Sequence, residues 1–246
     1  MHNDSGTALF EGRRYEELDH PSGEVGAVLE DASFHPGRSG RNHLRVLAAA
    51  GRHPRGRVDE VLNAVGWSDA RDRRVKGYSM GMRQRLAIAA ALLGDPEILI
   101  LDEPANGLDP PGIRWMRDLL RSEAGRGRAV LVSSHLLSEV AQSVDDVVVI
   151  SHGELRASGP LSSVLGSPDG PATRVSAKDA GRLASILRDA GHTVDAGGDD
   201  DTLVVRGVTP EAVGAVANEH RIALHQLVAV SRSLEEAFFE LTGGEG

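Results

Sequence analysis

The feature that most constrains this chain is a series of short apolar segments separated by segments of helical pattern. Residues 25–29, 97–101, 129–134 and 145–151 are almost continuously apolar, and residues 6–11 are a shorter candidate strand. Strands buried on both faces have continuous apolar runs, and the helices between them cover the two faces of a parallel sheet. The first part of the sequence therefore predicts an α/β fold built on a parallel sheet.

The last third of the chain has a different order of elements. Patterns of strand, helix, strand, strand, helix and strand follow one another in residues 172–246, with a helix at the end. This β-α-β-β-α-β order is ferredoxin-like, and the segment SPDGP at 167–171 has the composition of a linker. We therefore expect an α/β domain at 1–166 with a helical subdomain at about residues 32–93. A small ferredoxin-like α+β domain is expected to follow the linker.

Composition excludes several classes of function. The chain has 27 Lys and Arg against 36 Asp and Glu, a net charge of −9, so no nucleic-acid partner is expected, because such binding needs a cationic face. It contains no cysteine, which excludes a disulfide partner and thiol catalysis. The longest uncharged apolar stretch, 86–93, is far shorter than the roughly 20 residues of a membrane-spanning helix. We expect a soluble, cytoplasmic protein.

Two adjacent carboxylates follow the apolar run ILIL. Asp102 and Glu103 end a predicted buried strand, so both emerge at the carboxyl edge of the sheet, where open α/β sheets bind ligands. In nucleotide hydrolases an Asp in this place holds magnesium and the following Glu polarises the attacking water. The alternative is a solvated acidic pair before a turn, and the two residues alone do not distinguish these readings.

Three further segments can be interpreted either as part of a phosphate-binding site or as ordinary structural features. Ser79 is a predicted N-cap, whose following backbone N–H groups point at an anion, and Gly81 lets a phosphate approach the backbone. His135 follows the strand at 129–134 and is placed to contact a terminal phosphate. The segment 106–109 is an Asn-Gly turn. Taken singly, these are also an ordinary capped helix, a surface histidine and a simple turn.

Together and in this order, the four segments resemble the motifs of the ATP-binding subunits of ABC transporters. YSMGMRQR takes the place of the signature LSGGQ-QR segment, ILILDEP of the Walker B motif, NGLD of the D-loop and SSHLLSEV of the switch-histidine segment. The resemblance covers about residues 6–165, and the tail ending in SLEEAFFELT looks like the C-terminal extension of exporter-type members. YSMGM in place of LSGGQ is similar to the drug and antibiotic exporter branch.

The resemblance implies ATP and Mg²⁺ as cofactors, and it assigns roles to residues. It gives hydrolysis to Glu103 and His135. It gives nucleotide contacts to four positions of the signature and D-loop segments: Ser79, Met80, Gly81 and Asp109. It gives the metal to Asp102, with Glu30 at the family's glutamine position as a second ligand.

The resemblance also implies partners and a location. Two ATPase subunits, identical or different, would pair head to tail, so that Ser79 and Gly81 of one close on the nucleotide held by the other. The helical segment 36–76 would dock a separate membrane permease. The chain would then lie in the cytoplasm, peripheral on the inner face of the cell membrane.

One expected motif is missing from the sequence. A P-loop has the pattern G-x-x-x-x-G-K-[ST], but the two lysines, Lys76 and Lys178, are each preceded by a residue other than Gly. The nearest imitation, HPGRSGRN, has Arg41 in the lysine position and lacks the first Gly. The resemblance therefore implies an N-terminally truncated chain, an incomplete P-loop NTPase sheet, and weak or absent ATP hydrolysis. The loss also predicts open edges on the strands at 129–134 and 145–151, with aggregation as the consequence.

Two functions from different classes remain open at this point. In the first, the chain is an ATPase subunit that energises export through the permease. In the second, it is a non-catalytic fragment that lends Ser79 and Gly81 to the nucleotide of an intact ATPase. A weaker third reading gives residues 171–246 a sensing role of their own, for which the ordinary alternative is a packing or dimerisation module.

Overall fold

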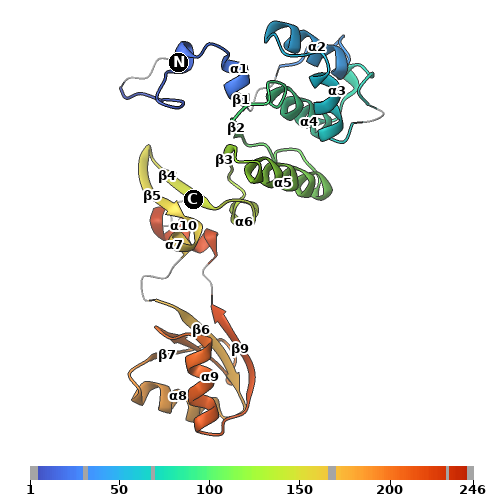
Figure 1. Cartoon of the computed structure of the whole chain (residues 1–246). Helices are drawn as coiled ribbons and strands as arrows, with labels where there is room; N and C mark the ends of the chain where they lie inside the picture. The colour runs from blue at the N-terminus through green and yellow to red at the C-terminus, as the bar shows by residue number, and fades with distance from the viewer. Residues whose placement is uncertain (1–4, 30–32, 68–69, 166–169, 231–232, 243–246) are drawn as a thin grey trace. The chain divides into compact units, whose positions relative to one another are not determined.

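The structure is a computed structural model that describes residues 5–29, 33–67, 70–165, 170–230 and 233–242 (Figure 1). The chain divides into two compact units, Met1–Leu136 and Leu137–Gly246. No helix of the described residues is long and apolar enough to span a membrane.

The first unit contains a three-stranded sheet. Strands β1 (Val25–Val28), β2 (Ile98–Asp102) and β3 (Ala129–Ser133) are parallel and lie in the order β1-β2-β3. The predicted parallel sheet is thus confirmed for these three segments. Because parallel strands end at the same edge, the last register pair of β2 and β3 sets Asp102 opposite Ser133.

The three longest helices of the first unit begin where the sequence supplies a capping side chain. The longer helices α2, α4 and α5 follow Ser39, Ser79 and Asp109, and each of these side chains accepts a backbone N–H of its helix. The elements are η1 (Tyr15–Glu17), α1 (Pro21–Glu24), α2 (Gly40–Ala50), α3 (Arg57–Ala64), η2 (Val75–Gly77), α4 (Met80–Ala91) and α5 (Pro110–Gly125).

The core of the first unit joins the helical part to the sheet. Helix α4 is apolar around most of its second half and is accordingly buried there. Leu44 of α2, Leu62 of α3 and Leu86 of α4 are fully buried in the same cluster as Leu99 and Leu101 of β2. The position of strand β2 is therefore fixed by packing against helices that precede it in the sequence.

The strand predicted at residues 6–11 is wrong. The described part of this segment has a single isolated bridge, Phe10 to Arg13, around a turn at Glu11–Gly12. A short apolar run becomes a strand only where a partner strand satisfies its backbone groups, and here residues 6–9 are exposed.

The second unit begins with a hairpin and the helices around it. Strands β4 (Asp146–Ser151) and β5 (Glu154–Pro160) pair antiparallel, so β4 does not belong to the parallel sheet as its sequence pattern suggested. Helices α6 (Leu137–Ala141) and α7 (Leu161–Leu165) flank the hairpin, and the last helix, α10 (Leu234–Thr242), packs against α6, α7 and β5.

This packing groups residues 137–165 with the C-terminal part of the chain, whereas we expected the break at the linker 167–171. Most of that linker lies outside the described residues. The division into domains at 1–166 and 172–246 therefore stays a prediction.

The rest of the second unit has the ferredoxin-like order. Its elements are β6 (Ala172–Ala177), α8 (Ala180–Asp189), β7 (Thr193–Ala196), β8 (Thr202–Arg206), α9 (Pro210–Glu219) and β9 (Leu224–Val230). The sheet order is β7-β8-β6-β9 with every pair antiparallel. Both helices cover one face of this sheet (Figure 1), over a core that includes Val175, Leu183, Val205 and Val213.

Apolar side chains are exposed on three strands that have a partner on one side. Among the described residues, β3 pairs only with β2 and β4 only with β5. Leu131 of β3 is 60% exposed, and Val148, Ile150 and Leu155 of the hairpin are 58%, 63% and 65% exposed. The pairing of β3 and β4 with one strand each supports the predicted open strand edges, and the exposure values show that these strands also have uncovered apolar faces.

Candidate functional site

A cluster of polar side chains lies at the carboxyl edge of β2 and β3. Ser133 Oγ donates a hydrogen bond to Asp102 Oδ1 at 2.5 Å. The Oγ of Ser133 also accepts a hydrogen bond from the backbone N–H of Glu103 at 2.9 Å. One hydroxyl at the end of β3 therefore holds both acidic residues at the end of β2.

Glu103 also contacts the histidine that follows β3. Its Oε2 lies 2.9 Å from His135 Nδ1. The Glu103 side chain is 21% exposed and the His135 side chain 65% exposed, so the pair borders solvent. A carboxylate held beside an imidazole at a solvent-facing edge can accept a proton from a water molecule.

The structure thus brings together three residues that the sequence assigned to catalysis and metal binding: Asp102, Glu103 and His135. Ser133, which connects Asp102 and Glu103, was missed. A signal for it was present in the sequence, because the predicted strands 97–101 and 129–134 are of similar length. Pairing them in parallel places a residue near 133 beside Asp102.

The signature segment lies at the N-terminus of α4. Ser79 is the N-cap, as predicted, and its Oγ accepts the N–H of Met82 at 3.3 Å. Met80 lies against Gly107, since a Cβ built on Gly107 would be 2.1 Å from Met80 Cε. A Cβ on Gly81 would lie 3.3 Å from Leu108 Cδ2, so the signature and D-loop segments pack on each other.

Asp109 has a local structural role. It is the N-cap of α5, and its Oδ1 accepts the N–H of Gly112 at 2.9 Å. The turn before it is connected to the acidic cluster, because the N–H of Asn106 donates to the carbonyl oxygen of Glu103 at 3.1 Å. The D-loop segment therefore connects the Glu103 cluster with the signature helix.

The assignment of Asp102 and Glu30 as metal ligands stays a prediction. Glu30 lies outside the described residues. Among the described residues no group of three or more His, Asp or Glu side chains could hold a metal ion. Mg²⁺ in nucleotide sites is bound by one or two carboxylates together with phosphates and water, and Asp102 at the sheet edge fits that limited role.

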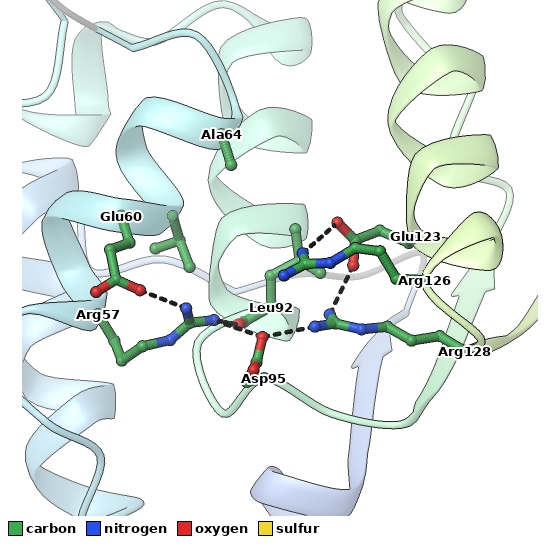
Figure 2. A pocket seen from close by; sticks show the side chains of 9 residues that line it. Arg57, Glu60, Ala64, Leu92, Asp95, Glu123, Arg126 and Arg128 are labelled. Carbon is green, nitrogen blue, oxygen red and sulfur yellow. Dashed lines mark hydrogen bonds and ion pairs between the residues drawn. The ribbon is translucent and has the colours of Figure 1, made fainter.

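A charged pocket of about 230 Å³ lies elsewhere in the first unit (Figure 2). Asp95 precedes β2 and Arg128 precedes β3, so the pocket is at the opposite end of these strands from Asp102 and Ser133. Arg128 pairs with Asp95 and with Glu123, both at 2.6 Å, and Arg57 of α3 pairs with Asp95 at 3.0 Å. The arginines are matched by carboxylates, which indicates a structural network.

Comparison with known proteins places the chain in a family. A sequence profile described as "ABC transporter" matches residues 1–106, and one described as a domain of unknown function matches residues 171–235. The chain is 32% identical to the bacitracin transport ATP-binding protein BcrA of Enterococcus faecalis, over 98% of this chain and 80% of the relative. It is 32% identical to the daunorubicin resistance ATP-binding protein DrrA3 of Streptomyces coeruleorubidus, over 90% and 73%.

Solved structures have the same fold. The ATP-binding subunit of an ABC transporter superposes with a TM-score of 0.58 at 24% identity, covering 65% of this chain and 69% of the other. The protein cbiO1 of Clostridium perfringens, part of the ABC transporter complex cbiONQ, superposes with a TM-score of 0.55 at 27% identity, covering 65% and 68%. The chain belongs to the ATP-binding proteins of ABC transporters, and its predicted α/β fold class is confirmed.

Proposed function

We propose that the chain is the ATP-hydrolysing subunit of an ABC transporter that energises export through a separate membrane permease. In this role it pairs with a second ATPase subunit and lies on the cytoplasmic face of the membrane, held there by the permease. Relatives named for bacitracin transport and daunorubicin resistance support export of antibiotic-like compounds. The permease selects the compound.

The observation that carries the proposal is the contact between Glu103 and His135 beside Asp102. Glu103 accepts the proton of the water that attacks the terminal phosphate. His135 holds the Glu103 carboxylate in place and faces the phosphate. Asp102 would hold Mg²⁺, which would neutralise phosphate charge there.

The contacts to the ATP phosphates are the weak part of the proposed site in this chain. A P-loop supplies backbone N–H donors and one lysine to the phosphates, and no Gly-Lys pair occurs in these 246 residues. Each charged hydrogen bond is worth about 1.5–3 kcal/mol, so losing several lowers ATP affinity by orders of magnitude. We expect the chain by itself to bind ATP weakly and to hydrolyse little or none.

Titration of the purified chain with a fluorescent ATP analogue, together with phosphate release in the presence of Mg²⁺, tests this expectation. The exposed Glu97, at the other end of β2, provides the matched control Glu97→Gln for Glu103→Gln. Tight nucleotide binding by the chain alone, with turnover abolished by Glu103→Gln and kept by Glu97→Gln, would overturn the expected weakness. Failure to associate with any permease would count against the transport role.

A second function is supported by the exposed position of Ser79 at the N-terminus of α4. In this second function the chain contributes its signature segment to a nucleotide bound by an intact ATPase subunit and hydrolyses no ATP itself. Mixing the chain with such a subunit distinguishes the two. Hydrolysis that falls with Ser79→Ala but not with Glu103→Gln in this chain indicates the lending role, whereas loss with Glu103→Gln indicates a catalytic one.

A further inference from the structure

The backbone of Glu103 is in an unusual conformation. Its φ is +46°, in the left-handed region, which a residue with a Cβ adopts only at a cost. Five other non-glycine residues among those described have positive φ: Glu11, Arg52, Asp95, His152 and Arg221. These five lie in turns or just beyond the ends of helices, where left-handed backbone is common. Glu103 instead directly follows the parallel strand β2, at the proposed site.

A left-handed residue of this kind persists only where its surroundings hold it. The ladder between β2 and β3 ends with the pair Asp102 and Ser133, and Glu103 is the residue that directly follows it. The side chain of Ser133 supplies the acceptor for the N–H of Glu103, because its Oγ accepts this N–H at 2.9 Å. The hydroxyl proton is used as well, since it is donated to Asp102 Oδ1 at 2.5 Å.

We propose that Ser133 is a positioning residue that holds Glu103 in its left-handed conformation and sets the direction of both carboxylates. The bond to Asp102 orients the hydroxyl, so that its lone pair faces the Glu103 N–H. A bond to an ionised carboxylate is shorter and stronger than one between neutral groups, which fixes this orientation. The importance of Ser133 for hydrolysis rests on the proposed function of Glu103, whereas its effect on the backbone does not.

The neighbouring serine provides a matched control. Ser134 Oγ accepts the N–H of Leu136 at 3.0 Å, and no hydrogen bond of the described residues connects it to Asp102 or Glu103. Ser134→Ala therefore removes the same chemical group one residue away. Ser133→Thr keeps the hydroxyl, while Ser133→Ala removes it from an exposed position without opening a cavity.

Amide hydrogen exchange of the full ¹⁵N-labelled chain, followed by NMR, tests the proposal without ATP hydrolysis. We expect the Glu103 amide to exchange roughly five- to tenfold faster in Ser133→Ala, the factor for losing one ordinary hydrogen bond. It should keep its wild-type rate in Ser133→Thr and Ser134→Ala. The amides of Leu86 and Leu101, in the core, should be unchanged in all three variants.

Two results would overturn the proposal. One is a wild-type exchange rate at Glu103 in Ser133→Ala, which means that other groups hold the residue. The other is a parallel acceleration of Glu103, Leu86 and Leu101, which means that Ser133 acts only on overall stability. An absence of ATP hydrolysis affects neither reading, so failure of the proposed function remains separate from failure of this inference.

Discussion

The guanidinium group of Arg85 lies over the indole ring of Trp115, with its central carbon 3.9 Å from the ring centroid. Arg85 belongs to the signature helix α4 and Trp115 to α5, which begins at the D-loop. Arg85 Nη1 also donates to the carbonyl oxygen of Val65 at 2.9 Å, beyond the end of α3. Burial lowers the pKa of Arg85 from its ordinary value, while the negative charge of Asp109 acts in the opposite direction. One side chain therefore joins three helices around the signature segment.

Replacing Arg85 should destabilise the first unit. We expect Arg85→Gln to lower the free energy of unfolding by about 2 kcal/mol, since it removes a cation–π contact and a charged hydrogen bond. Arg85→Lys should recover only part, because an ammonium group does not stack on a ring as a planar guanidinium does. Both tryptophans, Trp67 and Trp115, are in the first unit, so urea unfolding followed by Trp fluorescence measures it directly. A loss of equal size in the exposed Arg83→Gln control would contradict this assignment.

Gly107 is the tightest point between the D-loop and the signature segment. Its φ is +73°, and an added Cβ would lie 2.1 Å from Met80 Cε. Gly107→Ala should cost about 1–2 kcal/mol in backbone strain, with a further loss from displacing Met80. Gly127 has a similar φ of +88° with no atom within 4 Å, so Gly127→Ala measures the strain alone.

A double-mutant cycle separates the two contributions at Gly107. Adding Met80→Ala to Gly107→Ala should recover the loss that exceeds the cost of Gly127→Ala, because the displaced side chain is gone. Equal costs for the two glycine variants, with no recovery, would show that the contact is unimportant for stability. The midpoint of urea unfolding is again the measurement.

Local patterns in the sequence predicted most of the elements. The apolar spacing of Val58, Val61, Leu62 and Val65 predicted a helix. Helix α3 covers Arg57–Ala64, Val65 follows it directly, and all four apolar side chains are buried. Ser79 was predicted as an N-cap and is one. Capping and helical periodicity depend on neighbours within about four residues, which is why single-sequence reasoning could find them.

Features that depend on distant partners were missed. The segment 6–11 has strand-like composition but no partner strand, and β4 pairs with β5 instead of entering the parallel sheet. The bonds of Ser133 depend on the register between β2 and β3, and the left-handed Glu103 depends on Ser133. Neither register nor backbone strain can be read from the composition of one segment.

The stability of the first unit should fall in mild acid because of His43. Burial, and secondarily the positive charge of Arg38, lower the pKa of His43 below its ordinary value. Its Nδ1 is buried without a hydrogen-bond partner among the described residues. The unfolded chain therefore binds the proton more readily than the folded one. The stability that depends on neutral His43 is complete above about pH 6.5 and is lost as the pH falls below that value.

Urea unfolding at pH 7.5 and 5.5, followed by Trp fluorescence, checks this dependence. His43→Leu should show a smaller loss between the two pH values than wild type. Some loss should remain, because burial also lowers the pKa of His53. The exposed His35 provides the control His35→Gln, which should behave as wild type. An unchanged pH dependence in His43→Leu would contradict the argument.

In the charged network of Figure 2, replacing the buried Glu123 should lower the free energy of unfolding, whereas replacing the exposed Arg126 should change it little. The side chains of Glu123 and Arg128 are 7% and 10% exposed and lie 2.6 Å apart. Glu123→Gln should cost about 2–3 kcal/mol, because it leaves a buried guanidinium with one carboxylate fewer. Arg126 is 58% exposed, and Arg126→Gln should change stability by less than about 0.5 kcal/mol. Equal effects in urea unfolding would mean that burial does not govern this network.

The exposed apolar face of the hairpin should make the isolated chain prone to association. Ile150 and Leu155 are opposite each other in the β4–β5 ladder, and both side chains are more than half exposed. An exposed apolar strand with an open edge is a site for aggregation. We expect light scattering of the purified chain to rise with concentration, and the variant Ile150→Thr with Leu155→Thr to suppress that rise. Since both residues face solvent, the substitution should leave the unfolding transition nearly unchanged. A wild-type chain that stays monomeric up to its thermal unfolding, and unfolds cooperatively, would show that this face does not cause association.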